Sequence, residues 1–480
     1  MKRKMQRTEK KKWIERGKTA VIVFLVFCCV YFLYLLFDLY SEQISVENIL
    51  WNSESLTLSE ADRKSTDEIL DDILAPEDIF INGGNAHQKI LPEYPEYAQM
   101  VRVLGQNLHK VYFAKAEDIS VAKWEDWIGA LGEYGVYVKY PVSHQSDFEG
   151  ELLGAKNSAF QKNIRAYRDL ILTTGVVVDT GVTVFAREEE TDKIVKISLG
   201  EDSFGLRDII KKSGGKNDAG YMFAFELNLN EENTKNSSQG VSFDSMLMIP
   251  SGNVEIEGIV FDVPRRYRGG TSFTGTTEVT GGLTGLFGFN PNTIRQYANS
   301  DGALMFVGET GSLSVHPGGR IEYKSLSENE GIPLLHNGQG AANSMVLSGV
   351  FALAEKTFDI CGMSDEKHEA KLKMTRLEKV VGGSTKFNFD YFVDENRVNF
   401  GDGPAMYAVV KNGVLIEFKI QIKTIEKIGD KKDCGDMFDA IDSFLKANAK
   451  VNKIFYGCAV YNYTEDKKDT FGAWEIQGGM

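Results

Sequence analysis

The first forty residues combine a basic stretch with an uninterrupted apolar run. The run, Thr19–Phe37, follows a polar segment, Met1–Lys18, which holds nine lysines and arginines and two glutamates. Helical residues rise about 1.5 Å each, so the run spans roughly 28 Å, the thickness of a bilayer's hydrocarbon core. The pattern predicts a transmembrane helix over residues 19–39.

A cleaved secretory signal is the competing interpretation of this run. Signal peptides usually carry apolar regions of about 7 to 15 residues that end at small residues. This run instead ends in large residues, Leu35–Tyr40, without an A-x-A pattern. Basic flanks remain in the cytoplasm. We therefore expect a single-pass cell-membrane protein with a basic cytoplasmic tail, residues 1–18, and most of the chain outside the cell.

Beyond a charged juxtamembrane stalk, residues 40–75, periodicities of both kinds alternate along the chain. Period-2 stretches predict strands and period-3.6 stretches predict helices. The first group of predicted elements comprises a strand at 78–81, a helix at 94–109, a helix capped by Ser120 and running through Leu131, and a strand at 136–140. They indicate an α/β or α+β unit.

The rest of the chain is richer in strands and turn residues. A Gly/Thr-rich stretch, residues 268–285, is typical of a surface loop. The other predictions are strands at 182–185, 194–197, 222–229 and 454–463, a hairpin of 242–249 with 254–260, and helices at 344–355 and 436–445. The predicted class is α+β with antiparallel sheets, divided into an N-terminal α/β domain, 76–190, a middle α+β domain, 191–330, and a C-terminal α+β domain, 331–480.

One weak internal repeat supports this division. Leu313–Lys324 and Tyr407–Lys419 each read as a strand, a glycine turn and a strand with the pattern I-E-aromatic-K. Repeated patterns indicate repeated structural units. We interpret them as two related hairpins in two similar tandem units, against the alternative of a chance match.

Charge and cysteine content narrow the classes of function. The chain has a net charge of −14 although its first 18 residues are strongly basic, so the remainder is acidic and a poor nucleic-acid binder. Beyond the predicted anchor lie only Cys361, Cys434 and Cys458. That number is too small for a disulfide scaffold. A Cys434–Cys458 bridge is one alternative, and reduced buried thiols are the other.

No motif in the sequence indicates catalysis. The six histidines are scattered, without H-E-x-x-H or paired-cysteine spacing, and no G-x-S-x-G elbow occurs. Three acidic residues, Asp436, Asp439 and Asp442, share one face of a predicted helix, and we interpret them as a solvated face rather than a cation site. We expect no enzyme, no metal and no cofactor; an extracellular hydrolase would need carboxylates that converge on one pocket.

Two groups of residues are candidate contacts. Arg265, Arg266 and Arg268 form a basic cluster in an acidic region. We interpret them as loop residues that solvate the chain; the alternative is that they bind an acidic partner or, if the protein is an envelope-binding or adhesion module, an anionic wall polymer. The predicted membrane helix offers a second surface for a partner helix. Residues spaced three and four apart lie on one face, and here these are Phe24, Cys28, Tyr31 and Leu35.

Several segments of the chain together carry a resemblance to a known family. They are Leu74–Gly84, Gly135–Pro141, Leu286–Pro291 with Arg295, Asp301–Gly302, Phe306–Val307, Gly311, Leu313–Val315 and Gly319–Tyr323, and Ala473–Ile476. These segments resemble the YycH family, accessory regulators of the WalK/WalR (also called YycG/YycF) two-component system in low-GC Gram-positive bacteria. The similarity runs in patches across most of the region beyond the anchor, and it departs from the family at 234–249 and 268–285.

The resemblance implies a non-enzymatic membrane regulator. Its expected partners are a WalK-type sensor histidine kinase and a YycI-type protein, reached through the membrane helix and the extracytoplasmic region. It also implies that the last two domains are related to each other and to YycI, in agreement with the hairpin repeat. The family supplies no active-site motif.

Overall fold

A computed structural model describes most of the chain beyond the predicted stalk. The described residues are 76–83, 87–92, 94–175, 181–188, 191–213, 220–229, 241–268, 277–327, 331–334, 343–380, 382–464 and 469–479. Within these ranges, no helix combines the length and the apolarity needed to cross a bilayer. The predicted tail, membrane helix and stalk lie outside the described residues.

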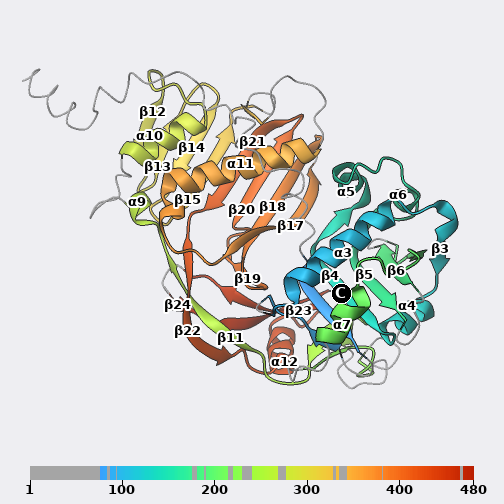
Figure 1. The fold of residues 1–480 in the computed structure, drawn as a ribbon. Coiled ribbons are helices and arrows are strands. Elements are labelled where there is room, and N and C mark those ends of the chain that lie inside the picture. The colour runs from blue at the N-terminus through green and yellow to red at the C-terminus, as the bar shows by residue number, and fades with distance from the viewer. Residues whose placement is uncertain are drawn as a thin grey trace, which may run out of the picture. The chain divides into compact units, whose positions relative to one another are not determined.

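Nine of the described strands form an antiparallel sheet, here called the N-terminal sheet (Figure 1). Its strand order is β10-β8-β2-β1-β4-β5-β6-β7-β3. The strands are β1 (Asp78–Asn82), β2 (His87–Lys89), β3 (Ile119–Ala122), β4 (Gly135–Gln145), β5 (Ala166–Thr174), β6 (Val182–Glu188), β7 (Ile194–Ser198), β8 (Gly220–Phe223) and β10 (Met248–Pro250).

Helices cover both faces of the N-terminal sheet because its central strands are apolar on both sides. In β1, Ile79 packs in the cluster that contains α3, whereas its neighbour Phe80 packs with Trp127 of α4 on the other face. Successive strand residues point to opposite faces, which produces this division. The helices of this region are α3 (Tyr97–Tyr112), α4 (Trp124–Leu131), α5 (Ser146–Leu152), α6 (Ala159–Asn163) and α7 (Leu206–Ser213), with a 3₁₀ turn, η3 (Ala116–Asp118).

The structure confirms the first predicted strand and helix and corrects the second helix's start. Helix α3 begins and ends three residues later than predicted. Ser120 is not a cap: it lies in β3, paired with Lys196 of β7, because the flanking Ile119 and Val121 favour a strand. Helix α4 begins at Trp124, where the Asp126 carboxylate accepts a hydrogen bond from the backbone N–H of Lys123.

Two strand predictions in the middle of the chain are wrong. The predicted strand 222–229 ends at Phe223, where the Glu226 carboxylate accepts a hydrogen bond from the Phe223 N–H and a turn follows. The predicted hairpin of 242–249 with 254–260 is also absent. Strand β10 pairs with β8, whereas β11 (Glu255–Asp262) pairs with β22 and β24 in another sheet. The turn residues between them therefore connect two sheets.

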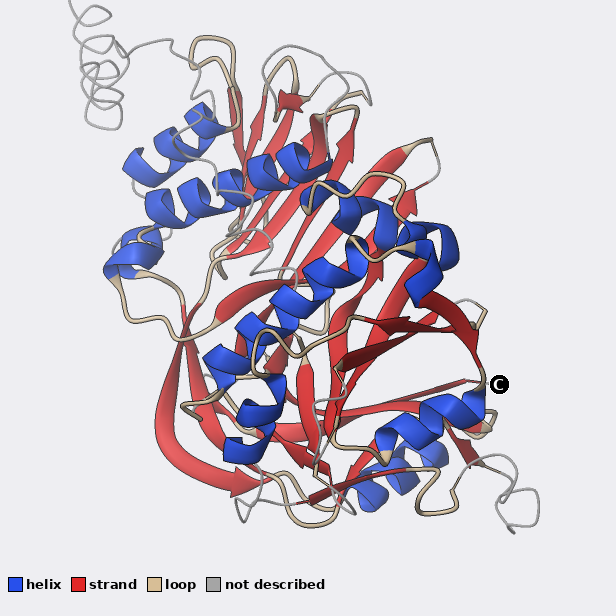
Figure 2. Ribbon diagram, turned by 45° about the vertical axis from the view of Figure 1, so that its right-hand side comes forward, coloured by secondary structure: helices blue, strands red, loops and turns tan. Residues whose placement is uncertain are grey.

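Thirteen described strands form the second large sheet, here called the C-terminal sheet (Figure 2). Its main path is β12-β13-β14-β15-β21-β20-β18-β19-β23-β25, with β16, β17 and β9 paired at its sides. The strands are β9 (Ser242–Phe243), β12 (Arg295–Ala298), β13 (Leu304–Val307), β14 (Gly311–Val315), β15 (Arg320–Ser325), β16 (Ile332–Pro333), β17 (Lys371–Val380), β18 (Ser384–Val393), β19 (Asn396–Asn399), β20 (Met406–Lys411), β21 (Val414–Gln421), β23 (Lys453–Asn462) and β25 (Gly472–Gly479).

The two hairpins of the repeat are confirmed and lie side by side. They are β14–β15 and β20–β21, and β15 pairs with β21. In this pairing Tyr323 faces Phe418, while Glu322 faces Lys419 and Lys324 faces Glu417. Equivalent positions of the repeat thus meet across an approximate twofold axis at the Tyr323–Phe418 pair.

The predicted loop 268–285 is corrected in its second half, because Thr277–Leu286 form helix α10. Its buried Val279 and Leu283 lie one turn apart and pack into the core of the C-terminal sheet. Gly282 lets α10 approach α11 closely, since a Cβ atom there would lie 3.0 Å from Ile360. Gly282, one of the glycines that indicated a loop, therefore serves helix packing.

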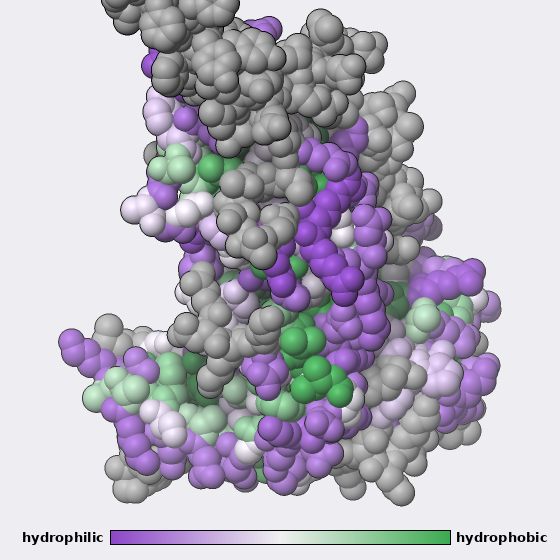
Figure 3. Space-filling view, turned by 90° about the vertical axis from the view of Figure 1, so that its left-hand side faces the viewer, coloured by the Kyte–Doolittle hydropathy of each residue, from purple (hydrophilic) through white to green (hydrophobic). Residues whose placement is uncertain are grey.

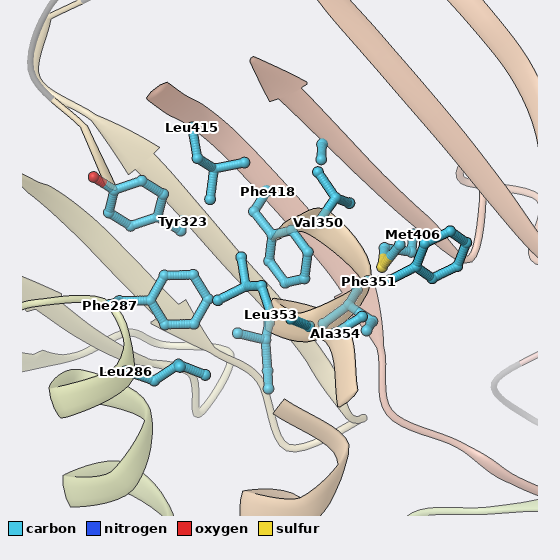
Figure 4. Packing of buried hydrophobic residues seen from close by; sticks show 14 of the residues in the cluster. Leu286, Phe287, Tyr323, Val350, Phe351, Leu353, Ala354, Met406, Leu415 and Phe418 are labelled. Carbon is cyan, nitrogen blue, oxygen red and sulfur yellow. The ribbon is translucent and has the colours of Figure 1, made fainter. Parts of the chain in front are cut away.

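The core of the C-terminal sheet lies between its central strands and helices α10 and α11 (Figure 4). Phe287 stacks on Tyr323, with ring centroids 5.3 Å apart, and lies 5.8 Å from Phe418. Phe351 of α11 packs edge-on against Phe389 of β18. The remaining described helices are α9 (Arg265–Arg268), α11 (Asn343–Cys361), α12 (Met437–Ala447) and η4 (Met363–Asp365).

A three-stranded sheet, β22-β11-β24, completes the described structure. It contains β11, β22 (Thr424–Asp433) and β24 (Asp469–Thr470). Helices α11 and α12 and strand β23 agree with the predictions for the last third of the chain. The mixture of helices with mainly antiparallel sheets confirms the α+β class. The predicted domain bounds stay predictions.

Candidate functional site

The predicted membrane contact residues, Phe24, Cys28, Tyr31 and Leu35, lie outside the described residues. Their assignment to a partner-binding face stays a prediction.

The three arginines lie in or beside the short helix α9, and two of them are paired with carboxylates. Arg266 forms ion pairs with Glu278 and, at 3.8 Å, with Asp365. Arg268 pairs with Asp262. The backbone N–H of Arg265 donates to Glu366, so four acidic residues surround the cluster. Figure 3 shows mostly hydrophilic residues around smaller hydrophobic areas on the side where α9 lies in Figure 1.

Asp436, the first of the three acidic residues, has a structural role at the start of the last helix. Asp436 is the N-cap of α12 and accepts hydrogen bonds from the backbone N–H groups of Phe438 and Asp439. Such caps satisfy the free N–H groups of a helix's first turn. Among the described residues, no three His, Cys, Asp or Glu side chains gather closely enough to hold a metal ion.

The three described cysteines are free thiols. Cys361 is buried, and Cys434 and Cys458 are partly buried. Burial raises the pKa of the Cys434 thiol to about 11 and that of Cys458 to about 12. Since the thiolate is the reactive form, these groups are poor nucleophiles at neutral pH.

Helix α5 connects the two large sheets through its opposite sides. Phe148 and Leu152 pack into the core of the C-terminal sheet, where α11 lies. Glu149 points instead into the N-terminal region, where it is 1 % exposed and accepts hydrogen bonds from the hydroxyls of Tyr112 at 2.6 Å and Tyr167 at 2.5 Å. The Nδ1 atom of buried His144 lies 3.4 Å from the same carboxylate.

A second connection is a buried ionic cluster. The turn between β18 and β19 places Glu395 beside strands β1 and β2 of the N-terminal sheet. The Nζ atom of Lys89 lies 2.5 Å from Asp78 Oδ1 and 3.5 Å from Glu395 Oε2. Burying charges is costly unless they are paired. The ammonium group of Lys89 therefore forms ion pairs with two carboxylates, one from each sheet.

Further charges line the same boundary around Glu77, just before β1. Its carboxylate lies 3.8 Å from Lys139 of β4 and 3.5 Å from Arg168 of β5. Tyr456 of β23 donates a hydrogen bond to it at 3.2 Å, and the ammonium of Lys139 lies 4.8 Å from the centre of the Tyr456 ring. The boundary between the sheets is therefore polar and specific in its partners.

Sequence reasoning did not single out either connection. Lys89 and Glu395 are 306 positions apart, and no short motif announces their contact. The one local signal is the presence of charged residues inside otherwise apolar strand patterns, such as Asp78 before Ile79–Ile81. Charged residues are almost never fully buried unless they are paired. The sequence could indicate that a partner exists but not which residue it is.

This boundary couples charged groups of the two sheets. Burial, offset in part by the charge of Lys89, raises the pKa of Glu395 to about 7. The pKa of Asp78 is lowered, because the charges of Lys89, Lys139 and Lys373 outweigh the effect of its burial. Two carboxylates on one lysine thus differ in their ionisation.

Known proteins share the fold but little of the sequence. No known family model matches the chain, and no curated protein matches it. Among solved structures, it is similar to the crystal structure of YycH from Bacillus subtilis, with a TM-score of 0.52 and 11% sequence identity. The match covers 87% of this chain and 96% of that chain. The chain has a YycH-like fold. At this identity the likeness establishes the fold alone.

Proposed function

We propose that the protein is a non-enzymatic, membrane-anchored regulator of a WalK-type sensor histidine kinase. The observation that supports this most strongly is the YycH-like fold, because the match extends over 87% of the chain rather than one common motif. The patches of resemblance in the sequence point to the same family.

The sequence supports a location at the cell membrane. The apolar segment 19–39 would cross the bilayer once, and the basic tail before it would stay in the cytoplasm. The described residues would then lie outside, where a YycI-type protein and the extracytoplasmic part of the kinase are the expected partners. The same arrangement brings the membrane helix beside the kinase's own membrane helices.

The proposed mechanism is a shift in an existing equilibrium of the kinase. A helix that packs better against one arrangement of the kinase's membrane helices raises the population of that arrangement. A tenfold change in population requires about 1.4 kcal/mol of differential binding. Dispersion contacts of about 0.1–0.2 kcal/mol per atom pair make this attainable for a few side chains.

The test uses the full-length chain and the kinase of the same organism in lipid nanodiscs. We expect the chain to co-purify with the kinase and to change its autophosphorylation rate. Changing Phe24, Cys28, Tyr31 and Leu35 together to alanine should remove the effect. The matched control changes four residues on the opposite side of the predicted helix to alanine, namely Ile22, Val26, Cys29 and Leu33. Co-purification that neither variant affects would exclude the helix as the contact.

A further inference from the structure

The turn that joins β18 to β19 extends from the C-terminal sheet into the buried ionic cluster. Glu395 in this turn is 3% exposed, and the neighbouring residue, Asp394, has the left-handed backbone angle φ of 56° that shapes the turn. Asp394 pairs with Lys427 of β22 at 2.7 Å. One residue of the turn is thus held by its own side of the molecule, while the next is buried against the other sheet.

Several charged and titratable groups face Glu395 from the elements packed around it. Those that act directly on its carboxylate are Lys89 of β2, Asp78 of β1, Lys373 of β17 and Tyr97 of α3. Tyr221 of β8 and Cys458 of β23 also surround Lys89. Lys139 of β4 acts on Asp78, and Glu77 and Lys371 act on Lys373. In this surrounding, Lys89 is closer to Asp78 than to Glu395 by 1.0 Å.

A second lysine, Lys373, also acts on the carboxylate of Glu395 and lowers its pKa. It is 8% exposed, and burial lowers the pKa of its ammonium. Its Nζ atom lies 5.1 Å from the centre of the Phe392 ring. An ionised Glu395 would therefore be a second negative charge that shares Lys89 with Asp78, and like charges in one buried site disfavour each other.

The sign of the pH effect follows from the two states of Glu395. Its pKa is about 7 where it is buried, and its ordinary value is 4.5. The closed contact therefore binds a proton more tightly than an opened, hydrated one. Closure is fully favoured below pH 4.5, and this advantage is lost as the pH rises through 7.

We propose that the contact between Glu395 and the Lys89–Asp78 pair is a proton-controlled latch between the N-terminal and C-terminal sheets. Protonated Glu395 fits the buried site, and ionised Glu395 loosens it. The latch would make the arrangement of the region outside the membrane depend on the acidity of the cell envelope. It does not require that the protein regulates a kinase.

The test measures hydrogen exchange in the purified full-length chain in detergent micelles, corrected for the intrinsic pH dependence of exchange. With pKa values of about 7 and 4.5 for the two states, opening around β2 should become about 20-fold more favourable between pH 5.5 and pH 7.5. Glu395→Gln, which cannot ionise, should show less than about a threefold change. The matched control, Glu117→Gln, removes an exposed carboxylate and should keep the natural response.

Two results would overturn the latch: a natural chain whose corrected protection does not change over this range, or a Glu395→Gln chain that keeps the full change. If circular dichroism shows that Glu395→Gln does not fold, Asp78→Asn supplies the second variant. It leaves Lys89 to Glu395 alone, so the midpoint of opening should move to lower pH. An unchanged midpoint would contradict the proposal. Kinase binding enters none of these readouts, so the proposed function is tested separately.

Discussion

Glu149 shows how this protein accommodates a buried carboxyl group on a short helix. Its side chain is almost fully enclosed, and it accepts two short hydrogen bonds from tyrosine hydroxyls. Removing one of these donors would leave a buried acceptor with fewer partners, which costs free energy. The two tyrosines therefore fix the position of α5 between the sheets.

Tyr167→Phe should test this directly. The substitution keeps the buried ring and removes one donor to Glu149, so we expect the free energy of unfolding to fall by about 1.5–3 kcal/mol. Urea denaturation monitored by fluorescence measures it. Tyr297→Phe is the matched control, because the Tyr297 side chain is 50% exposed and should change stability by less than about 0.5 kcal/mol. If Tyr167→Phe left the free energy of unfolding unchanged, one donor to Glu149 would be sufficient.

The arginine cluster belongs to the residue scale as well. Because Arg266 and Arg268 already pair with carboxylates, replacing all three arginines with glutamine should leave binding to cell-wall fractions unchanged. Stability should fall by no more than about 1 kcal/mol for each exposed pair. A pelleting assay with the full-length chain in detergent measures the binding. Loss of pelleting would instead favour the wall-binding alternative.

What the sequence could show about single residues depended on whether their partners are local. The capping role of Asp436 is a local effect: the helix was predicted from residue 436, and the structure begins it one residue later, at Met437, with Asp436 as the N-cap. The pairing of Lys89 with Glu395 is not local, and neither residue was singled out. The ion pairs of Arg266 could not be predicted from the sequence either, because Glu278 and Asp365 become its neighbours only in the fold.

The hairpin repeat is the clearest success of the sequence pattern at the scale of elements. The pattern I-E-aromatic-K predicted two similar hairpins, and both are present. That they pair with each other through Tyr323 and Phe418 did not follow from the repeat, because strand order depends on the whole sheet. Helix α10 was missed since its glycines favour loops by propensity, whereas tertiary packing against α11 favours a helix.

The turn of the first hairpin offers a sharp test. Gly319 has a φ of 92°, and a Cβ atom at this position would lie 2.4 Å from the carbonyl oxygen of Ile422. Gly319→Ala should therefore lower the free energy of unfolding by about 2 kcal/mol or more. Gly105→Ala is the opposite control: it lies within α3 with no neighbour within 4 Å of a new Cβ, and it should raise stability by up to about 1 kcal/mol. Chemical denaturation of both variants measures the difference.

At the scale of the whole molecule, the fold is similar to a known structure although the sequences share few identical residues. A chain with 11% identity to Bacillus subtilis YycH keeps a similar arrangement over most of its length. The α+β class followed from periodicity, because it depends on the spacing of apolar residues. The joining of the strands into two large sheets did not, and the failed hairpin of 242–249 with 254–260 shows why: adjacent strands in sequence became members of different sheets.

The molecule's two large sheets meet through α5 and through the Glu395 turn. If the protein regulates a kinase, a change at this boundary would act on the kinase through the region outside the membrane or through the predicted helix. The predicted helix carries the named contact residues, so variants in it test the proposed function most directly.

The most direct measurement is a membrane two-hybrid assay between the full-length chain and the WalK-type kinase of the same organism, with residues 1–60 tested in parallel. We expect a specific signal from both, lost when Phe24, Cys28, Tyr31 and Leu35 are changed together and retained in the opposite-face variant. A signal from the full-length chain alone would move the contact to the region outside the membrane. No signal from either, with both proteins present in the membrane, would contradict the assignment as a kinase regulator.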